Sequence, residues 1–213
     1  ADITVADINQ STLDALKDFD ANINVNLYSI NAVADADIVL LAVKPWLVES
    51  VIDEIKFNLN YEKQIIISMA AGVSLETLSG YLTREKGERL PALFRMIPNT
   101  AIEVRQSLTV IASKNTTDEQ DNLILSIFNE LGKAMLIPEK QINAFMSLSS
   151  CGIAFAFRYI RAAMEGGVQM GIPPAIAKDS ILQTLRGAVE LLENTGAHPE
   201  AEIDKVTTPG GIT

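Results

Sequence analysis

The stretch Ile38-Val39-Leu40-Leu41-Ala42-Val43, followed by Lys44-Pro45, decides the fold class. It is an unbroken apolar run of strand length, and a strand that is covered on both faces has this composition. A second run of the same kind, Ile65-Ile66-Ile67, follows about twenty residues later. We therefore predict that both runs are central strands of a parallel sheet.

Short apolar runs alternate with amphipathic stretches on both sides of these two strands, which is typical of βα units. The predicted strands are 3–6, 23–27, 38–43, 64–69, 92–97, 108–112 and 134–137. The predicted helices between them are 11–19, 46–57, 74–82 and 118–131. The last helix has the clearest start, because Thr117 is placed as N-cap with Gln120 three residues later.

The pattern changes after Pro138. Residues 139–171 show no strand alternation and predict one or two long helices with a break near 149–152. Pro173 and Pro174 open another helix, Gly196 ends it, and a short helix is expected around 201–206. The sequence thus predicts two domains, an α/β domain over residues 1–138 and an all-helical domain over residues 139–213. Helices of this kind often need a partner surface.

Composition excludes several classes of protein. The 213 residues are 48% hydrophobic and 21% charged, which is ordinary for a globular protein and excludes disordered and collagen-like chains. Seventeen Lys and Arg against 27 Asp and Glu give a net charge of −10. Binding of nucleic acid or of an anionic membrane is therefore not expected, and a small-molecule partner is favoured.

Cysteine and hydropathy patterns indicate the compartment. Cys151 and His198 are the only residues of their types, so the chain can form no internal disulfide, and these two cannot assemble a structural zinc site by themselves. No apolar run approaches the roughly 18 residues of a membrane helix, and the first residues do not resemble a signal peptide. We expect a cytoplasmic protein.

Three strand ends carry candidate ligand-binding residues, because ligands of open parallel sheets bind outside the carboxyl ends of the strands. These segments are Ala42-Val43-Lys44-Pro45, Ala70-Ala71-Gly72 and Pro98-Asn99-Thr100. Small residues let a flat ligand approach the backbone, and Lys44 can meet a phosphate. The alternatives are a solvated loop lysine and close packing of a helix on a strand.

The chain contains no Gly-x-Gly-x-x-Gly among its 12 glycines, so the usual pyrophosphate-binding turn is missing. Dinucleotide binding then requires that the chain lack the first βα unit. Asp7 follows the first predicted strand, where dinucleotide folds place the carboxylate that binds the adenosine ribose hydroxyls. Alternatively, Asp7 is an acidic residue before the 11–19 helix, where the helix dipole favours negative charge.

The segment Thr207-Thr208-Pro209-Gly210-Gly211-Ile212-Thr213 combines hydroxyl groups with two unhindered glycine amides. Such backbone amides suit a carboxylate, and a plain surface turn is the alternative. His198 precedes a proline and is expected in a turn. Cys151 lies among small residues, and packing is favoured over a nucleophilic role.

Taken together, these motifs resemble pyrroline-5-carboxylate reductase, the last enzyme of proline biosynthesis. The resemblance covers essentially the whole chain. It is carried by residues 36–45 (ADIVLLAVKP), 68–73 (SMAAGV), 95–100 (RMIPNT), His198-Pro199 and 204–211 (DKVTTPGG). It implies an N-terminal Rossmann-like domain that binds NADPH or NADH, and a C-terminal helical domain that forms a homodimer or a higher homo-oligomer.

The resemblance also implies roles for individual residues. By this resemblance, the cofactor is lined by Ala42, Val43, Lys44 and Pro45. Its nicotinamide end lies by Ala70, Ala71 and Gly72, and the loop over the nicotinamide ring contains Asn99. Ser29 stands where many members have an asparagine near the adenosine ribose. Thr208, Pro209, Gly210, Gly211 and Thr213 form the substrate loop, which in the family reaches the cofactor of the partner subunit. We expect Thr213 to act in catalysis by orienting the ring nitrogen of the substrate, and the glycine amides to hold its carboxylate.

Some features depart from the family. Residues 149–155 read SSCGIAF where the family has SGSGPAY, which alters the start of the long helix on the substrate side. Asp7 would repel the 2′-phosphate of NADPH and predicts a preference for NADH. The missing glycine-rich turn and the Pro-Gly-Gly close to the last residue favour a chain that lacks both ends of the enzyme.

Two other functions are compatible with this fold. A β-hydroxyacid dehydrogenase needs a catalytic lysine on the long interdomain helix, and no lysine lies between Lys140 and Lys178. A non-catalytic sensor of a nucleotide or of a proline-like ligand remains an alternative.

Overall fold

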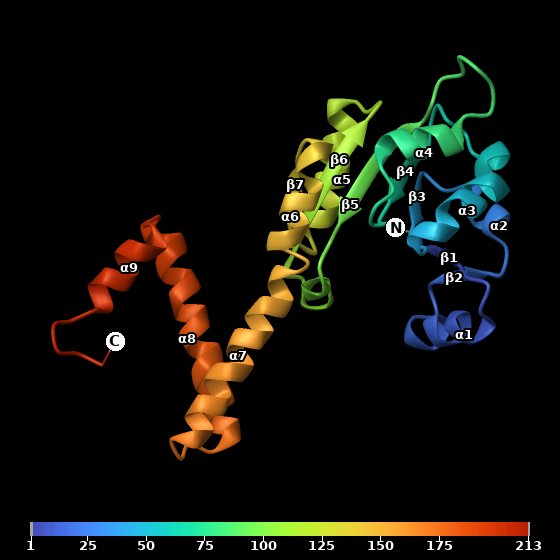
Figure 1. Ribbon diagram of the computed structural model, residues 1–213. Helices are drawn as coiled ribbons and strands as arrows, with labels where there is room; N and C mark the ends of the chain where they lie inside the picture. The colour runs from blue at the N-terminus through green and yellow to red at the C-terminus, as the bar shows by residue number, and fades with distance from the viewer. Residues whose placement is uncertain (1, 213) are drawn as a thin grey trace. The chain divides into compact units, whose positions relative to one another are not determined.

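The computed structural model describes residues 2–212 (Figure 1). The chain divides into two compact units, Ala1–Gly152 and Ile153–Thr213. Each of the seven predicted strands is present in the first unit. They are β1 (Thr4–Ala6), β2 (Asn24–Asn26), β3 (Ile38–Leu41), β4 (Ile65–Ser68), β5 (Ala92–Ile97), β6 (Ser107–Lys114) and β7 (Gly132–Leu136).

The strands form two sheets. β1 and β2 pair in parallel by themselves, and the other five form a sheet in the order β3-β4-β5-β6-β7. The expectation of a wholly parallel sheet is wrong for one pair, since β5 and β6 are antiparallel. Their connection, residues 98–106, is too short for the crossover of a dozen or more residues that a parallel pair requires.

The helices of the first unit largely follow the sequence prediction. They are α1 (Gln10–Phe19), α2 (Ser29–Val33), α3 (Val48–Ile55), α4 (Leu75–Leu82), α5 (Asp118–Asn129) and α6 (Ile142–Leu148), with the 3₁₀ turns η1 (Pro45–Leu47), η2 (Lys56–Asn58), η3 (Thr100–Val104) and η4 (Glu139–Gln141). The short α2 was not predicted. At the start of α5, Thr117 and Gln120 form the predicted capping box.

Hydrophobic clusters cover both faces of the larger sheet. Along β4, Ile66 belongs to the larger cluster, whereas Ile65 and Ile67 face the smaller one. The prediction of a central position is wrong for β3, which forms an edge of the five-stranded sheet. Leu40 of β3 is accordingly 46% exposed. Within residues 2–212 no further strand pairs with this edge.

The second unit is helical, as predicted. The break near 149–152 separates α6 from α7 (Gly152–Gln169), and α8 (Pro174–Thr195) and α9 (Pro199–Val206) follow. Gly196 ends α8 with a φ of +62°. At the turn between α7 and α8, a Cβ on Gly167 would lie 3.3 Å from the Cβ of Ala177.

This unit has almost no core of its own. Ala177 is the one buried hydrophobic side chain among its described residues, and many large apolar side chains are exposed. They include Phe155, Phe157, Tyr159, Val168, Met170, Ile176, Val189, Leu191, Ile203 and Val206. None of the helices in residues 2–212 has the combination of length and apolar character needed to cross a membrane.

Candidate cofactor and substrate site

Three predicted loops meet at the carboxyl edge of β3, β4 and β5. These strands are parallel neighbours, and Leu41, Ser68 and Arg95 lie side by side in their register. The segments 42–45, 70–72 and 98–100 leave the strands just beyond this level. The structure therefore brings these cofactor-binding candidates to one edge.

After β3, Ala42 and Lys44 are exposed, whereas Val43 and Pro45 are partly buried. Lys44 precedes η1, and its carbonyl accepts the N–H of Leu47 at 2.9 Å. Pro45 occupies the first position of that turn, where its fixed φ stabilises the bend. The Lys44 ammonium group is thereby presented on a short, ordered connection.

After β4, the backbone turns sharply and is held at its base. The N–H of Ala70 donates to the Ser68 hydroxyl at 3.3 Å, and the Ala70 side chain is buried. Ala71 and Gly72 are exposed, and Gly72 has a φ of +85° that favours glycine. No atom outside its neighbours lies within 4 Å of a Cβ built on Gly72, so this backbone is open to a ligand.

After β5, two other segments hold the Pro98–Asn99 loop. The N–H of Asn99 donates to the Ser107 hydroxyl at 3.1 Å, and its side-chain oxygen accepts the N–H of Ala101 at 3.0 Å. The Ser150 hydroxyl donates to the carbonyl of Pro98 at 3.2 Å. Ser150 replaces a glycine of the family pattern, so this chain has a hydrogen bond here that glycine cannot make.

Asp7 and Ser29 follow the two strands of the small parallel sheet. The Asp7 carboxylate accepts the N–H of Asn9 at 2.8 Å, and Asn9 in turn caps α1. Ser29 is the first residue of α2. The Asp7 carboxylate thus has a local backbone partner, consistent with the alternative of an acid before a helix, and both residues are partly accessible.

The predicted substrate segment lies in the second unit, after α9. The N–H of Gly211 donates to the carbonyl of Thr208 at 2.9 Å, with Pro209 and Gly210 between them. Gly210 has a φ of +69°, which makes this a type II turn. The Gly211 amide would have to leave the Thr208 carbonyl in order to bind a carboxylate. Thr213 lies outside the described residues.

His198 and Cys151 have structural surroundings. His198 is the extended N-cap residue of α9 and accepts the N–H of Glu200 through Nδ1 at 3.3 Å, so it lies at the start of a helix and not in the expected turn. Cys151 is exposed, which contradicts the expectation of a packed residue. In the described part of the chain no group of three or more His, Cys, Asp or Glu could hold a metal ion.

A buried ion pair, which the motifs in the sequence did not predict, lies at this edge. Arg95 of β5 is 7% exposed, and its Nη1 donates to Oε1 of Glu139 at 3.0 Å. The same carboxylate oxygen accepts the N–H of Leu75 at 2.7 Å. A charged residue inside the apolar run 92–97 was the available signal, since a buried arginine needs an acidic partner.

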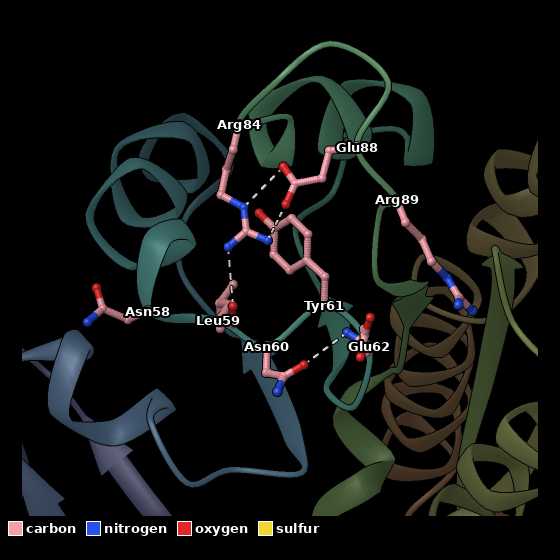
Figure 2. A pocket seen from close by; sticks show the side chains of 8 residues that line it. All are labelled: Asn58, Leu59, Asn60, Tyr61, Glu62, Arg84, Glu88 and Arg89. Atoms are coloured by element: carbon pink, nitrogen blue, oxygen red, sulfur yellow. Dashed lines mark hydrogen bonds and ion pairs between the residues drawn. The ribbon is translucent and has the colours of Figure 1, made fainter.

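A hollow of about 390 Å³ lies at the opposite edge of the sheet, where β4 and β5 begin (Figure 2). Arg84 lies over the ring of Tyr61 at 3.7 Å, forms an ion pair with Glu88 and donates to the carbonyl of Leu59. Burial raises the pKa of Tyr61 to about 12, and its hydroxyl donates to the carbonyl of Leu82 at 2.6 Å. The charged and polar groups of Arg84, Glu88 and Tyr61 are thus paired or hydrogen-bonded within the protein. No predicted site residue lines the hollow.

The carboxyl edge fits parts of a dinucleotide. The open backbone at Ala71 and Gly72 suits a flat ring, and Lys44 suits a phosphate. Asp7, which follows β1 of the separate two-stranded sheet, carries a carboxylate that suits ribose hydroxyls. The 213 residues contain no glycine-rich turn for the pyrophosphate, so we assign that group to no residue here.

A sheet covered on both faces, with candidate ligand-binding loops at its carboxyl edge and a helical unit after it, defines a Rossmann-type NADP-binding domain with a helical dimerisation domain. Family models agree with this class. The model described as "NADP oxidoreductase coenzyme F420-dependent" matches residues 1–72, and "Pyrroline-5-carboxylate reductase dimerisation" matches residues 139–213. The chain belongs to the pyrroline-5-carboxylate reductase family.

Individual relatives establish this membership. The pyrroline-5-carboxylate reductase of Arabidopsis thaliana is 32% identical over 211 residues, which cover 99% of this chain and 73% of the relative. Pyrroline-5-carboxylate reductase 1 of Dictyostelium discoideum is 36% identical, over 96% of this chain and 38% of the relative. The structure of a pyrroline-5-carboxylate reductase from Coxiella burnetii is similar with a TM-score of 0.85 at 28% identity, covering 99% of this chain and 76% of that chain. The chain thus spans between about two fifths and three quarters of these proteins.

Proposed function

We propose that the whole protein reduces the C=N bond of 1-pyrroline-5-carboxylate to give L-proline, with NADPH or NADH as the hydride donor. Family membership carries this proposal. The three loops at the carboxyl edge of β3, β4 and β5 support it, because they present small, accessible backbone where the family binds its cofactor.

The reaction depends mainly on the alignment of the nicotinamide ring with the ring of the substrate, and less on acid–base side chains. Bound NAD(P)H supplies a hydride to the imine carbon, and the electron pair of the C=N bond moves to the protonated nitrogen. The residues of this chain hold the two rings in place. Ala70, Ala71 and Gly72 shape the nicotinamide end, and the Asn99 loop borders it. Ala42, Val43, Lys44 and Pro45 lie along the cofactor, with Asp7 and Ser29 at the adenosine ribose.

The substrate is assigned to Thr208, Pro209, Gly210, Gly211 and Thr213. Backbone amides of glycine suit the carboxylate of the substrate, and the Gly211 amide takes this role once it has left the carbonyl of Thr208. Thr213 orients the ring nitrogen.

A homo-oligomer, at least a dimer, completes the second unit. Its helices expose large apolar side chains and bury only one of their own hydrophobic residues within the described range. Apolar surface of this extent marks an interaction site. A second copy of the chain is the partner that the dimerisation family model favours.

The domain division that we propose is 1–138 for the cofactor domain and 139–213 for the helical domain. The family match begins at residue 139, whereas the compact units divide after Gly152 because α6 packs against the sheet. The single cysteine supports a location in the reducing cytoplasm.

One assay tests the function. The purified whole protein is mixed with 1-pyrroline-5-carboxylate, and the oxidation of NADPH and of NADH is followed by absorbance at 340 nm together with proline formation. Turnover with stoichiometric proline supports the reductase. Binding of cofactor or proline without turnover would identify the sensor instead.

A further inference from the structure

Arg95 has an incomplete set of partners. It lies in the middle of β5 and its side chain is 9% exposed, which is rare for arginine. Nη1 donates to Glu139, while Nε is buried and has no hydrogen-bond partner among the described residues. The Glu139 carboxylate is therefore the counter-charge of this guanidinium group.

Glu139 also acts at the start of α4. The first N–H groups of a helix have no partner inside the helix. Ser74, the N-cap, accepts the N–H of Thr77 at 3.0 Å, and Oε1 of Glu139 accepts that of Leu75 at 2.7 Å. Since a carboxylate at a helix N-terminus is favourable, Glu139 caps α4 from 64 residues further along the chain.

These contacts fix both ends of the loop after β4. The Ser68 hydroxyl accepts the N–H of Ala70 at one end, and Glu139 holds Leu75 at the other. The exposed Ala71 and Gly72 lie between the two anchors. We propose that Glu139 is a positioning residue, which, oriented by Arg95, keeps the 70–74 loop in the form that receives the nicotinamide end of the cofactor. This inference rests on the proposed function.

The same helix offers a matched control. Glu76, one residue after Leu75, forms an ion pair with Lys114 at 2.7 Å but is 87% exposed. Glu76→Ala removes an acidic group from the first turn of α4 without touching the 70–74 loop. It is expected to leave the KM for cofactor unchanged.

The main test compares three variants of the whole protein. In Glu139→Ala, we expect the KM for NADPH or NADH to rise about tenfold while kcat at saturating cofactor stays within about twofold, since a hydrogen bond from backbone to carboxylate is lost. Glu139→Gln keeps an oxygen acceptor and is expected to restore most of the affinity. Glu139→Ala leaves the buried guanidinium charge of Arg95 without a counter-charge. The double variant Glu139→Ala with Arg95→Met removes this charge as well, and its Tm should be higher than that of Glu139→Ala.

The double variant separates positioning from a purely structural role. A raised KM for cofactor together with recovered Tm supports positioning. A KM that returns to the wild-type value along with Tm would overturn it, as would an unchanged KM in Glu139→Ala.

Hydrogen exchange provides a readout that needs no activity. In Glu139→Ala the amides of residues 70–75 should exchange about tenfold faster than in wild type or Glu76→Ala, because Leu75 has lost its acceptor. If exchange responds but the wild-type protein does not turn over, the loop restraint stands and the proposed reductase is wrong. If the wild-type protein turns over and neither exchange nor KM responds, the positioning role is wrong.

Discussion

Gly132→Ala should destabilise the sheet at a point that also supports the site. Gly132 opens β7 with a φ of +135°, and a Cβ there would lie 2.9 Å from the carbonyl carbon of Ser107 and closer still to the Ser107 oxygen and nitrogen. The strained φ costs about 1–3 kcal/mol. Overpacking adds about 1–3 kcal/mol, because strand backbone cannot swing aside as a side chain can. The sum is about 2–6 kcal/mol, and at about 2–4 °C per kcal/mol for a chain of this size Tm falls by roughly 4–24 °C.

Gly87→Ala is the matched control. Gly87 has a φ of +87° but nothing within 4 Å of a built Cβ, so it measures the cost of the dihedral angle alone. Urea denaturation followed by circular dichroism gives the free energy of unfolding of both variants. Because the Ser107 hydroxyl accepts the N–H of Asn99, kcat of Gly132→Ala should also fall. The reasoning is refuted if Gly132→Ala is no less stable than Gly87→Ala.

Four further changes test other parts of the protein. Asp7→Ser keeps an oxygen acceptor for the N–H of Asn9 but removes the negative charge, so the ratio of kcat/KM for NADPH to kcat/KM for NADH should rise. The control Asp14→Ser on α1 should leave this ratio unchanged. A wild-type preference for NADPH would contradict the placement of Asp7 at the adenosine ribose. Thr213→Ala should lower kcat/KM for pyrroline-5-carboxylate, and a value equal to that of the control Thr184→Ala would remove Thr213 from the mechanism. Ser150→Ala loses the hydrogen bond to the carbonyl of Pro98, so kcat should fall although the free energy of unfolding changes by only about 1 kcal/mol. An unchanged kcat would show that this hydrogen bond does not position the Pro98–Asn99 loop for catalysis. The pKa of Tyr61 is raised to about 12 from 10.0, so the unfolded chain loses this proton at a lower pH than the folded chain, and stability should decline from pH 10 to pH 12. The urea midpoint should decline less over this range in Tyr61→Phe than in Tyr28→Phe, which changes an exposed tyrosine. An equal decline of the two midpoints with pH would contradict this.

Local patterns in the sequence predicted most of the fold. Alternation and apolar runs located each strand, and capping residues located the start of α5 at Thr117 and the end of α8 at Gly196. These features are predictable because each depends only on residues close by in the sequence. Long-range pairing was less predictable. The apolar run at 38–43 indicated burial on both faces, yet β3 is an edge strand in the described chain because pairing depends on which strand lies next to it.

In the candidate site, too, local features were predicted from the sequence and long-range contacts were not. The loops after β3, β4 and β5 follow from the rule that ligands bind at the carboxyl ends of strands, and the structure brings them to one edge. The charged Arg95 in the apolar run 92–97 indicates that an acidic partner is needed, but nothing in the sequence identifies Glu139 as that partner, since 44 residues separate the two. Ser150 could be recognised as a departure from the family, but its bond to Pro98 depends on the path of the chain after α6.

The strand order β3-β4-β5-β6-β7 has a consequence for folding during synthesis. Every strand of this sheet pairs with the next one in the chain, so pairing can proceed in the order in which the ribosome delivers the strands, and each step closes only the one connection between two consecutive strands. The acceptor for the Leu75 N–H is made 64 residues later, after β7 has been completed. A nascent chain will therefore have its sheet before the 70–74 loop, which we propose receives the cofactor, is fastened, and acquisition of cofactor is expected to be one of the last events of maturation.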